Sequence, residues 1–191
     1  AYTMQNGDTE GDVPVLSNPT QISAGLGYVC ALDDNGLQCW GYNGFGQTNV
    51  PTDLVNPVVV AAGSSNSCAI DDNGLQCWGR NTDLGYIVPT GLVNPVAVSV
   101  GEGHTCAIDD NGVQCWGSNV PDVPDNLSNP TKIDAGGDGD RVHTCAIDDN
   151  GLQCWGRNNE GQTNVPTDLM NTRVISAGDL HNCAIDDNGV Q

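Results

Sequence analysis

One sequence unit recurs five times along the chain, and this repetition constrains the fold more than any other feature. Each copy contains a cysteine followed by Ala-(Ile/Leu)-Asp-Asp-Asn-Gly, and successive copies start 38, 38, 39 and 38 residues apart. These cysteines are Cys30, Cys68, Cys106, Cys145 and Cys183. Such a period is typical of tandem arrays, in which each unit buries its apolar face against its neighbours. We therefore expect one tandem-repeat domain over residues 1–191.

The same period sets the expected unit boundaries. A half unit spans residues 1–24, and units begin near residues 25, 63, 101, 136 and 178, the last being incomplete. Residues 5–14 (QNGDTEGDVP) resemble residues 42–51 (YNGFGQTNVP), so the first segment corresponds to the half that the last unit lacks. We expect Ala1 to Pro14 to complete the last unit, either in the same molecule or in the next one.

Each unit is predicted to contain a β-hairpin. Two short apolar stretches flank Asp-Asp-Asn-Gly, a loop sequence in which Asn and Gly accept positive φ. With Asp33 to Gly36 as a four-residue loop, Leu32 faces Leu37 and the first two cysteines lie opposite each other. The register predicts the disulfides Cys30–Cys39, Cys68–Cys77, Cys106–Cys115 and Cys145–Cys154, with Cys183 unpaired. Zinc is disfavoured, because eight residues separate the cysteines of each pair.

The rest of the unit also favours strands over helices. The chain has 25 glycines and 10 prolines and lacks helical periodicity. Asn-Pro pairs are expected to start turns, β-branched runs such as 58–63 and 96–101 to form inner strands, and the tryptophans to wedge between units. The predicted fold class is all-β, with propeller-like blades in an open array or in one completed by a neighbouring subunit. The tryptophans are Trp40, Trp78, Trp116 and Trp155.

Charge and cysteine content narrow the partners and the location. The chain has 24 acidic and 5 basic residues, a formal net charge of −19. Nucleic acid and anionic membranes are poor partners, because both require basic side chains. No segment reaches the roughly 20 apolar residues that span a bilayer. Nine regularly placed cysteines indicate an oxidising compartment, and we expect an extracellular protein.

Paired aspartates at the hairpin tips are candidate calcium ligands. As turn formers they need no metal, because Asp accepts hydrogen bonds from its own loop. Stacked hairpins would nevertheless align carboxylates in rows, and calcium binds such oxygen ligands and relieves their repulsion. The candidates are Asp33, Asp34, Asp71, Asp72, Asp109, Asp110, Asp148, Asp149, Asp186 and Asp187, with Asp53, Asp122, Asp125 and Asp168 as weaker ones.

No residue pattern predicts an enzyme. His104, His143 and His181 recur at one position of the unit, where the other copies have Tyr28 and Asn66. A base used in catalysis is a single tuned residue, so this interchange favours packing or hydrogen bonding. The chain contains neither a nucleophile elbow nor a phosphate-binding glycine loop.

The unit resembles the regulator of chromosome condensation repeat in its compact, cysteine-paired bacterial form. The resemblance rests on Ala177-Gly178, His181 and Cys183, and on Cys154-Trp155-Gly156 with Asn158 and Gly161-Gln162. It implies a propeller that presents binding surfaces. The family's closed ring usually has seven blades, whereas this chain has five units. Its nucleotide-exchange role on a small GTPase is not expected here, because the accompanying basic features are absent.

Two functional hypotheses follow, beside a third interpretation in which these 191 residues are an excerpt from a longer array. In the first, the chain is a structural subunit of an extracellular filament, assembles head to tail by completing half repeats between subunits, and is stabilised by calcium. In the second, it is a secreted closed propeller that binds a protein or glycan, as an inhibitor or adhesin does. The units' similarity to a secreted β-lactamase inhibitory propeller favours the second. The aromatic residues available for such binding are Tyr42, Phe45 and Tyr86.

Overall fold

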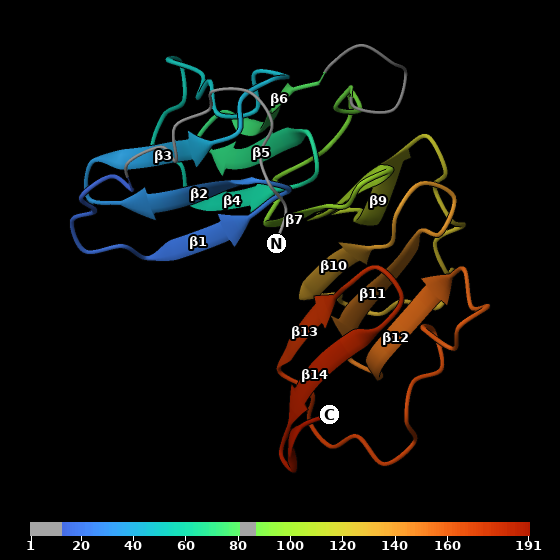
Figure 1. The fold of residues 1–191 in the computed structure, drawn as a ribbon. Helices are drawn as coiled ribbons and strands as arrows, with labels where there is room; N and C mark the ends of the chain where they lie inside the picture. Colours follow the sequence, from blue (N-terminus) through green and yellow to red (C-terminus); the bar gives the residue numbers. More distant parts are fainter. Residues whose placement is uncertain (1–12, 81–86) are drawn as a thin grey trace.

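The computed structural model describes residues 13–80 and 87–191, which form β-strands joined by turns and loops and contain no helix. The strands group into five three-stranded sheets, which we call blades 1 to 5 (Figure 1). Blade 1 contains β1 (Gln21–Ala24), β2 (Tyr28–Asp33) and β3 (Gly36–Gly41); blade 2 contains β4 (Val59–Ala62), β5 (Asn66–Asp71) and β6 (Gly74–Gly79); blade 3 contains β7 (Ala97–Val100), β8 (His104–Asp109) and β9 (Gly112–Gly117); blade 4 contains β10 (Lys132–Gly136), β11 (His143–Asp148) and β12 (Gly151–Gly156); blade 5 contains β13 (Val174–Ala177), β14 (Asn182–Asp186) and β15 (Gly189–Val190). The predicted all-β repeat fold is confirmed.

The hairpin register follows the prediction. Leu32 pairs with Leu37, and Cys30 pairs with Cys39. All four predicted disulfides are present, each joining Cα atoms 4.1 Å apart, and Cys183 is free and exposed. Each disulfide therefore joins the middle and outer strands of one blade.

The hairpin turn is tighter than the four-residue loop expected from the sequence. Asp33 pairs with Gly36, so Asp34 and Asn35 alone form the loop. Gly36 has a φ of 103°, but Asn35 is not among the residues with positive φ. Among the non-glycine residues described, positive φ occurs at the asparagine before each inner strand, with values from 48° to 52°. These residues are Asn18, Asn56, Asn94, Asn129 and Asn171.

The sheets divide the chain at points other than the sequence-based units. Val59 to Ala62 pair with the hairpin that follows them, so each β-branched run is the first strand of the next blade. Blade 1 accordingly has all three strands, because Gln21 to Ala24 pair with β2. The predicted half unit at residues 1–24 thus contributes the inner strand of blade 1, while residues 1–12 lie outside the described part of the chain.

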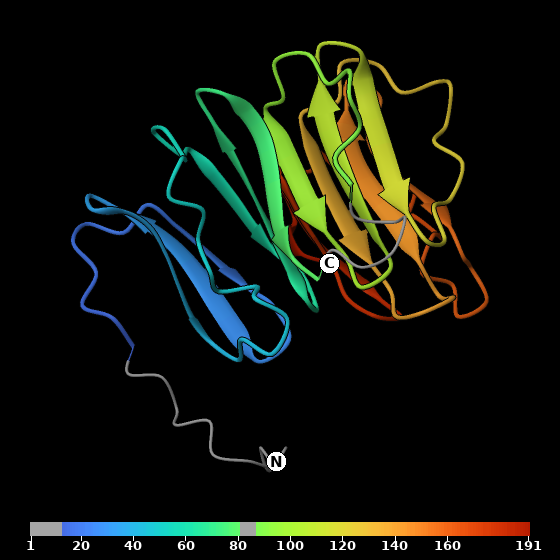
Figure 2. The ribbon, with the colours of Figure 1, turned by 90° about the horizontal axis from the view of Figure 1, so that it is seen from above.

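Successive blades stack face to face along an arc (Figure 2). Tyr28, Cys30 and Leu32 pack against Val60 and Ala62 of blade 2. We call the side of a blade that meets the following blade its forward face, and the opposite side its backward face. The same contact recurs between blades 2 and 3, through Ala61, Cys68, Ile70, Val98 and Val100. One interface is thus repeated along the array.

Candidate interaction surfaces

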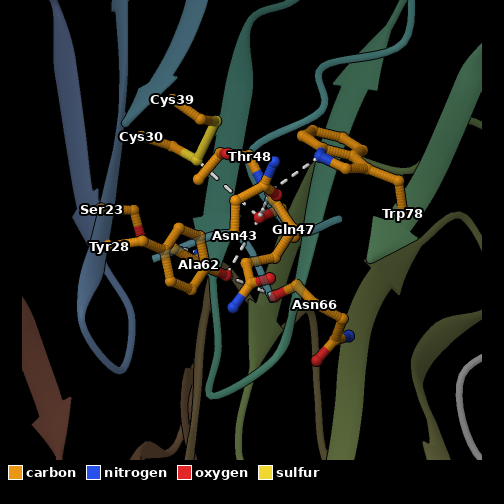
Figure 3. The surroundings of a disulfide bond; sticks show 11 residues. Ser23, Tyr28, Cys30, Cys39, Asn43, Gln47, Thr48, Ala62, Asn66 and Trp78 are labelled. Atoms are coloured by element: carbon orange, nitrogen blue, oxygen red, sulfur yellow. Dashed lines mark hydrogen bonds between the residues drawn. A yellow bond between two sulfur atoms is a disulfide. The ribbon is translucent and has the colours of Figure 1, made fainter. Parts of the chain in front are cut away.

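A buried polar network accompanies the apolar contacts between blades 1 and 2 (Figure 3). The Tyr28 hydroxyl donates to the carbonyl oxygen of Asn66 over 2.6 Å. The Ser67 hydroxyl lies 3.0 Å from the Tyr28 hydroxyl and 2.9 Å from the carbonyl oxygen of Gln47. The same Gln47 carbonyl accepts the indole N–H of Trp78 over 2.9 Å. Trp78 thus anchors the loop leaving blade 1 to the backward face of blade 2, the wedge position predicted for it.

The five inner strands border one central cavity of about 650 Å³. Side chains on these strands bind the backbone of the next blade. Gln21 makes two hydrogen bonds of 3.0 Å, to the N–H and the C=O of Val60. The carboxylate of Asp134 accepts hydrogen bonds from the Ser99 hydroxyl and from the backbone N–H of Ala177, each 2.7 Å long. Asp134 thus links blades 3, 4 and 5. Burial raises the pKa of Asp134 despite these donors.

Among residues 13–80 and 87–191, no blade packs on the backward face of blade 1. Ile22 on β1 is 68% exposed, whereas Val60 and Val98 at the same position of blades 2 and 3 are 2% and 8% exposed. The difference arises because Val60 and Val98 each pack against a preceding blade. Ile22 therefore presents at the surface an apolar side chain of the type that is buried inside the array.

No blade in the described part of the chain packs on the forward face of blade 5. Ile185 is 37% exposed, whereas Ile70 at its position in blade 2 is 4% exposed. Val174 and Val190 are also exposed, as is the free thiol of Cys183. The two ends of the array thus carry the two complementary halves of the repeated interface.

The aspartate pairs fasten each hairpin tip to the turn before its inner strand. The first aspartate accepts a backbone N–H of that turn over 2.8 or 2.9 Å, as Asp33 does from Ser17. The second accepts the side-chain amide of the positive-φ asparagine over 2.6 Å, as Asp34 does from Asn18. The pattern holds in all five blades, so all ten predicted aspartates have a structural role as turn formers.

Blade 3 allows the two aspartates to be compared by mutation. Asp109 is buried and accepts hydrogen bonds from Val93, Asn111 and Gln114. Burial alone would raise its pKa, but these hydrogen bonds lower it. Asp109→Ala is expected to lower the free energy of unfolding by about 2 kcal/mol, because it leaves buried donors unpaired. Asp110→Ala, at the exposed partner, should cost less than about 1 kcal/mol. Urea unfolding measures both, and equal losses would contradict the distinction.

The histidine position lies between blades. His104 and His143 are fully buried. Nε2 of His104 lies 2.8 Å from the Thr144 hydroxyl, and Nε2 of His143 lies 2.8 Å from the side-chain oxygen of Asn182. His181, in blade 5, is exposed. The two buried histidines thus hydrogen-bond to the following blade, the kind of role expected from their interchange with Tyr28 and Asn66.

Burial of His104 predicts a pH dependence of stability. Burial, aided by the nearby His143, lowers the pKa of His104 from 6.5 to about 4. The unfolded chain therefore binds a proton that the folded chain excludes, and stability is lost as the pH falls from 6.5 towards 4. His104→Asn, which introduces the residue of blade 2, should reduce this loss. Urea unfolding midpoints across that pH range test it, and parallel curves for the two proteins would contradict it.

A small aromatic cluster lies on the loop after blade 1. The rings of Tyr42 and Phe45 are 6.1 Å apart in an edge-to-face arrangement, and the Arg80 guanidinium lies 5.4 Å from the Phe45 centroid. Phe45 is exposed. Tyr86, the third predicted aromatic residue, lies outside the described residues. The structure thus brings together two of the three candidates.

Some residues with important contacts were not singled out from the sequence. Gln21, Gln47 and Asp134 all make hydrogen bonds between blades or within the connecting loop. The sequence does carry a signal for Asp134, because blades 1, 3 and 5 have serine at the same repeat position. Gln47 has an equivalent in Gln162, which the resemblance had already marked. The backbone partners of Gln21 leave no such sequence signal.

The repeated blades define a propeller-type repeat module. The family model of the Regulator of chromosome condensation (RCC1) repeat matches residues 20–47, 58–83, 96–120 and 131–162. The chain therefore belongs to the RCC1-repeat family. No match to this chain was found among curated proteins.

Solved structures share the fold. The ectodomain of the Physcomitrella patens receptor kinase CR4 is 25% identical with a TM-score of 0.74, and the alignment covers 93% of this chain and 52% of that one. The ectodomain of the Arabidopsis thaliana receptor kinase ACR4 is 24% identical (TM-score 0.67, covering 88% and 59%). Prp20p of Saccharomyces cerevisiae, described with its binding to Gsp1p and histones, is 17% identical (TM-score 0.69, covering 91% and 57%). This chain thus spans between half and three fifths of those chains.

Proposed function

We propose that this RCC1-repeat chain is an extracellular structural protein-interaction module that binds further copies of itself head to tail. The pair of uncovered end faces carries this proposal. Blade 5 presents Ile185 where Ile70 of blade 2 packs forward, and blade 1 presents Ile22 where Val60 packs backward. A second copy can seat its blade 1 on blade 5 by repeating the internal interface. Such a heterologous contact propagates into a filament unless its rotation closes a ring.

The extracellular location has two supports. Four disulfides within blades are typical of proteins that mature in an oxidising compartment. Two of the similar structures are ectodomains of receptor kinases. In the described part of the chain, no helix is long and apolar enough to cross a membrane.

Binding of calcium at the hairpin tips is a prediction separate from head-to-tail association. The second aspartate of each pair is exposed and has carboxylate oxygens available to solvent. Among the described residues, no three His, Cys, Asp or Glu side chains are grouped to hold a metal ion. If calcium bridges the tips within or between copies, adding it after chelator treatment should raise the thermal unfolding midpoint. Superimposable melting curves with calcium and with chelator would overturn the prediction.

Sedimentation velocity over a wide range of protein concentrations tests self-association. The native chain is expected to form larger species as the concentration rises. Ile22→Asp places a charge in the end-face contact and should keep the protein monomeric. Val58→Asp is the matched control, because Val58 is 65% exposed but lies on an internal blade. A native chain that stays monomeric throughout, or equal effects of both variants, would overturn head-to-tail association. Electron microscopy then separates filaments from closed rings, and rings alone would reject the filament.

The second candidate function is a binding module for another protein or a glycan. The cluster of half-buried Tyr42 with exposed Phe45 and Arg80 favours it, because aromatic and arginine side chains are enriched in binding hot spots. Phe45→Ala should weaken binding to such a partner without changing self-association. A Phe45→Ala variant that loses self-association instead would reject a separate site.

A further inference from the structure

The connection between β9 and β10 contains the motif Asn126-Leu127-Ser128. Asn-X-Ser/Thr, with X other than proline, is the acceptor motif for N-linked glycans. It occurs once in the 191 residues, because the other two Asn-X-Ser/Thr sequences, Asn18-Pro19-Thr20 and Asn129-Pro130-Thr131, have proline in the middle. The chain thus has a single candidate position for this modification, on an internal blade.

The side chain of Asn126 is accessible. Asn126 is exposed and lies in the turn at residues 125–126. Its Nδ2 atom donates to Oε1 of Gln153, on β12, over 3.2 Å. A side-chain amide nitrogen carries two hydrogens, so Nδ2 can bear a sugar and still donate to Gln153. The folded chain therefore accommodates a glycan on Asn126 without losing this contact.

The hydroxyl of Ser128 is not needed to form the turn. The backbone N–H of Ser128 donates to Asp148 over 2.8 Å, and Val55 and Val93 make the same backbone hydrogen bond in blades 2 and 3. The Ser128 hydroxyl lies 3.5 Å from the Asp149 carboxylate, which is too far for a strong O–H···O bond. The fold thus uses the backbone of Ser128, whereas the acceptor motif requires its hydroxyl.

Blade 1 contains the same turn without the acceptor. Residues 15–20 (VLSNPT) differ from residues 126–131 (NLSNPT) only at the first position, where Val15 takes the place of Asn126. In both turns the serine N–H donates to the first aspartate of the hairpin tip over 2.8 Å, and the asparagine side chain donates to the second over 2.6 Å. Val15 is 95% exposed. A side chain at this position of the unit therefore lies at the surface and not between blades.

We propose that Asn126 is an N-glycosylation site. This inference rests on the proposed extracellular location, because such glycans are found on secreted proteins. In the transfer, Nδ2 of Asn126 bonds to the anomeric carbon of a sugar carried by a lipid diphosphate of the secretory pathway. The bond from that carbon to the phosphate oxygen breaks, the lipid diphosphate leaves with the electron pair, and Nδ2 loses one proton.

The glycan would define one side of blade 4 as a surface that faces solvent. N-linked glycans are bulky and solubilising. Asn126 lies beside the hairpin of blade 4, because its amide reaches Gln153 and its carbonyl oxygen accepts the Asn150 side chain over 3.5 Å. Partner proteins are therefore expected to bind elsewhere on the array.

The test is to secrete the native sequence from mammalian cells, behind a secretion signal. Intact mass before and after treatment with peptide N-glycosidase should show a glycan that the enzyme removes, and peptide mapping should place it on Asn126. Asn126→Gln should abolish the glycan. Ser128→Val should also abolish it and still be secreted, because it introduces the residue of blades 2 and 3. Ser128→Thr, which keeps the motif, should retain it.

Val15→Asn provides a matched gain of the site. It recreates the sequence of residues 126–131 in the equivalent turn of blade 1, and a second glycan is expected. A native-sequence protein secreted without a glycan would overturn the site, and so would a glycan that persists in Ser128→Val. A Val15→Asn protein with no second glycan would overturn the inference that this turn presents the acceptor.

Glycopeptide mapping of protein from its natural source shows whether the site is used. An unmodified Asn126 there, in a sequence that mammalian cells glycosylate, would overturn the proposal through the extracellular location on which it rests. An unmodified Asn126 in the protein secreted by mammalian cells would overturn it through the site itself. Neither measurement depends on head-to-tail association, so the two failures can be told apart.

Discussion

Reduction of the four disulfides is expected to unfold the chain without denaturant. Each disulfide joins cysteines nine residues apart, and closing so short a loop stabilises a fold by roughly 2–3 kcal/mol. Four such contributions total about 10 kcal/mol, which is comparable with the whole stability of a domain, about 5–15 kcal/mol. Circular dichroism with and without a reductant, at a reduction state established by intact mass, measures the effect.

Two variants separate the disulfides from general effects of the reductant. The double variant Cys68→Ala/Cys77→Ala removes one disulfide and should lower the free energy of unfolding by about 2–3 kcal/mol or more, because Cys68 is also buried between blades 2 and 3. Cys183→Ser should leave stability nearly unchanged, since Cys183 is free and exposed. A reduced chain that keeps the native spectrum would contradict the expectation and would also remove the strongest support for an extracellular location.

The repeat spacing carried most of the fold prediction. The nearly equal steps between cysteines gave the number of units, and the cross-strand register of Leu32 and Leu37 followed from the hairpin pattern. Both predictions depend on local geometry, since a two-residue alternation determines which cysteines face each other. The disulfides were therefore predictable from one hairpin alone.

The division of strands among blades was harder to predict, because it depends on non-local pairing. Val59 to Ala62 lie about as close in sequence to β5 after them as to the turn before them. Only the antiparallel pairing with β5 assigns them to blade 2. The positive φ at Asn56 has a similar origin, since the Asp72 carboxylate that binds its side chain comes from the hairpin tip.

The interaction surfaces were predictable only in part. The sequence indicated self-association through incomplete units, a prediction that rests on Ala1 to Pro14 and so lies largely outside the described residues. The described residues instead show an exposed Ile22 on the three-stranded blade 1. Exposure of Ile22 cannot be read from its residue type, because the equivalent Val60 is equally apolar and buried. The aspartate rows were recognised, but their asparagine and backbone partners lie 16 to 20 residues away.

Gly79→Ala is expected to destabilise blade 2 more than Gly74→Ala, the substitution of the other glycine in strand β6. Gly79 has a φ of 107°, and a methyl group there would lie 2.6 Å from the Ser65 carbonyl oxygen and 3.2 Å from the Cα atom of Gln47. The substitution therefore combines backbone strain of about 1–3 kcal/mol with a backbone clash of similar size. Because the clash reaches the loop that Trp78 anchors, the contact between blades 1 and 2 should loosen as well.

The hairpin offers a matched control in Gly74. Its φ is 111°, but a methyl group there meets no atom within 4 Å. Gly74→Ala should show the strain alone, and Gly79→Ala should unfold at lower urea and expose Trp78 to a fluorescence quencher under native conditions. The difference between the two unfolding midpoints measures the cost of the clash with the backbone near Ser65, because both variants carry the same strain from positive φ. Equal midpoints would mean that the backbone near Ser65 moves aside, and the glycine after each tryptophan would then be explained by φ alone.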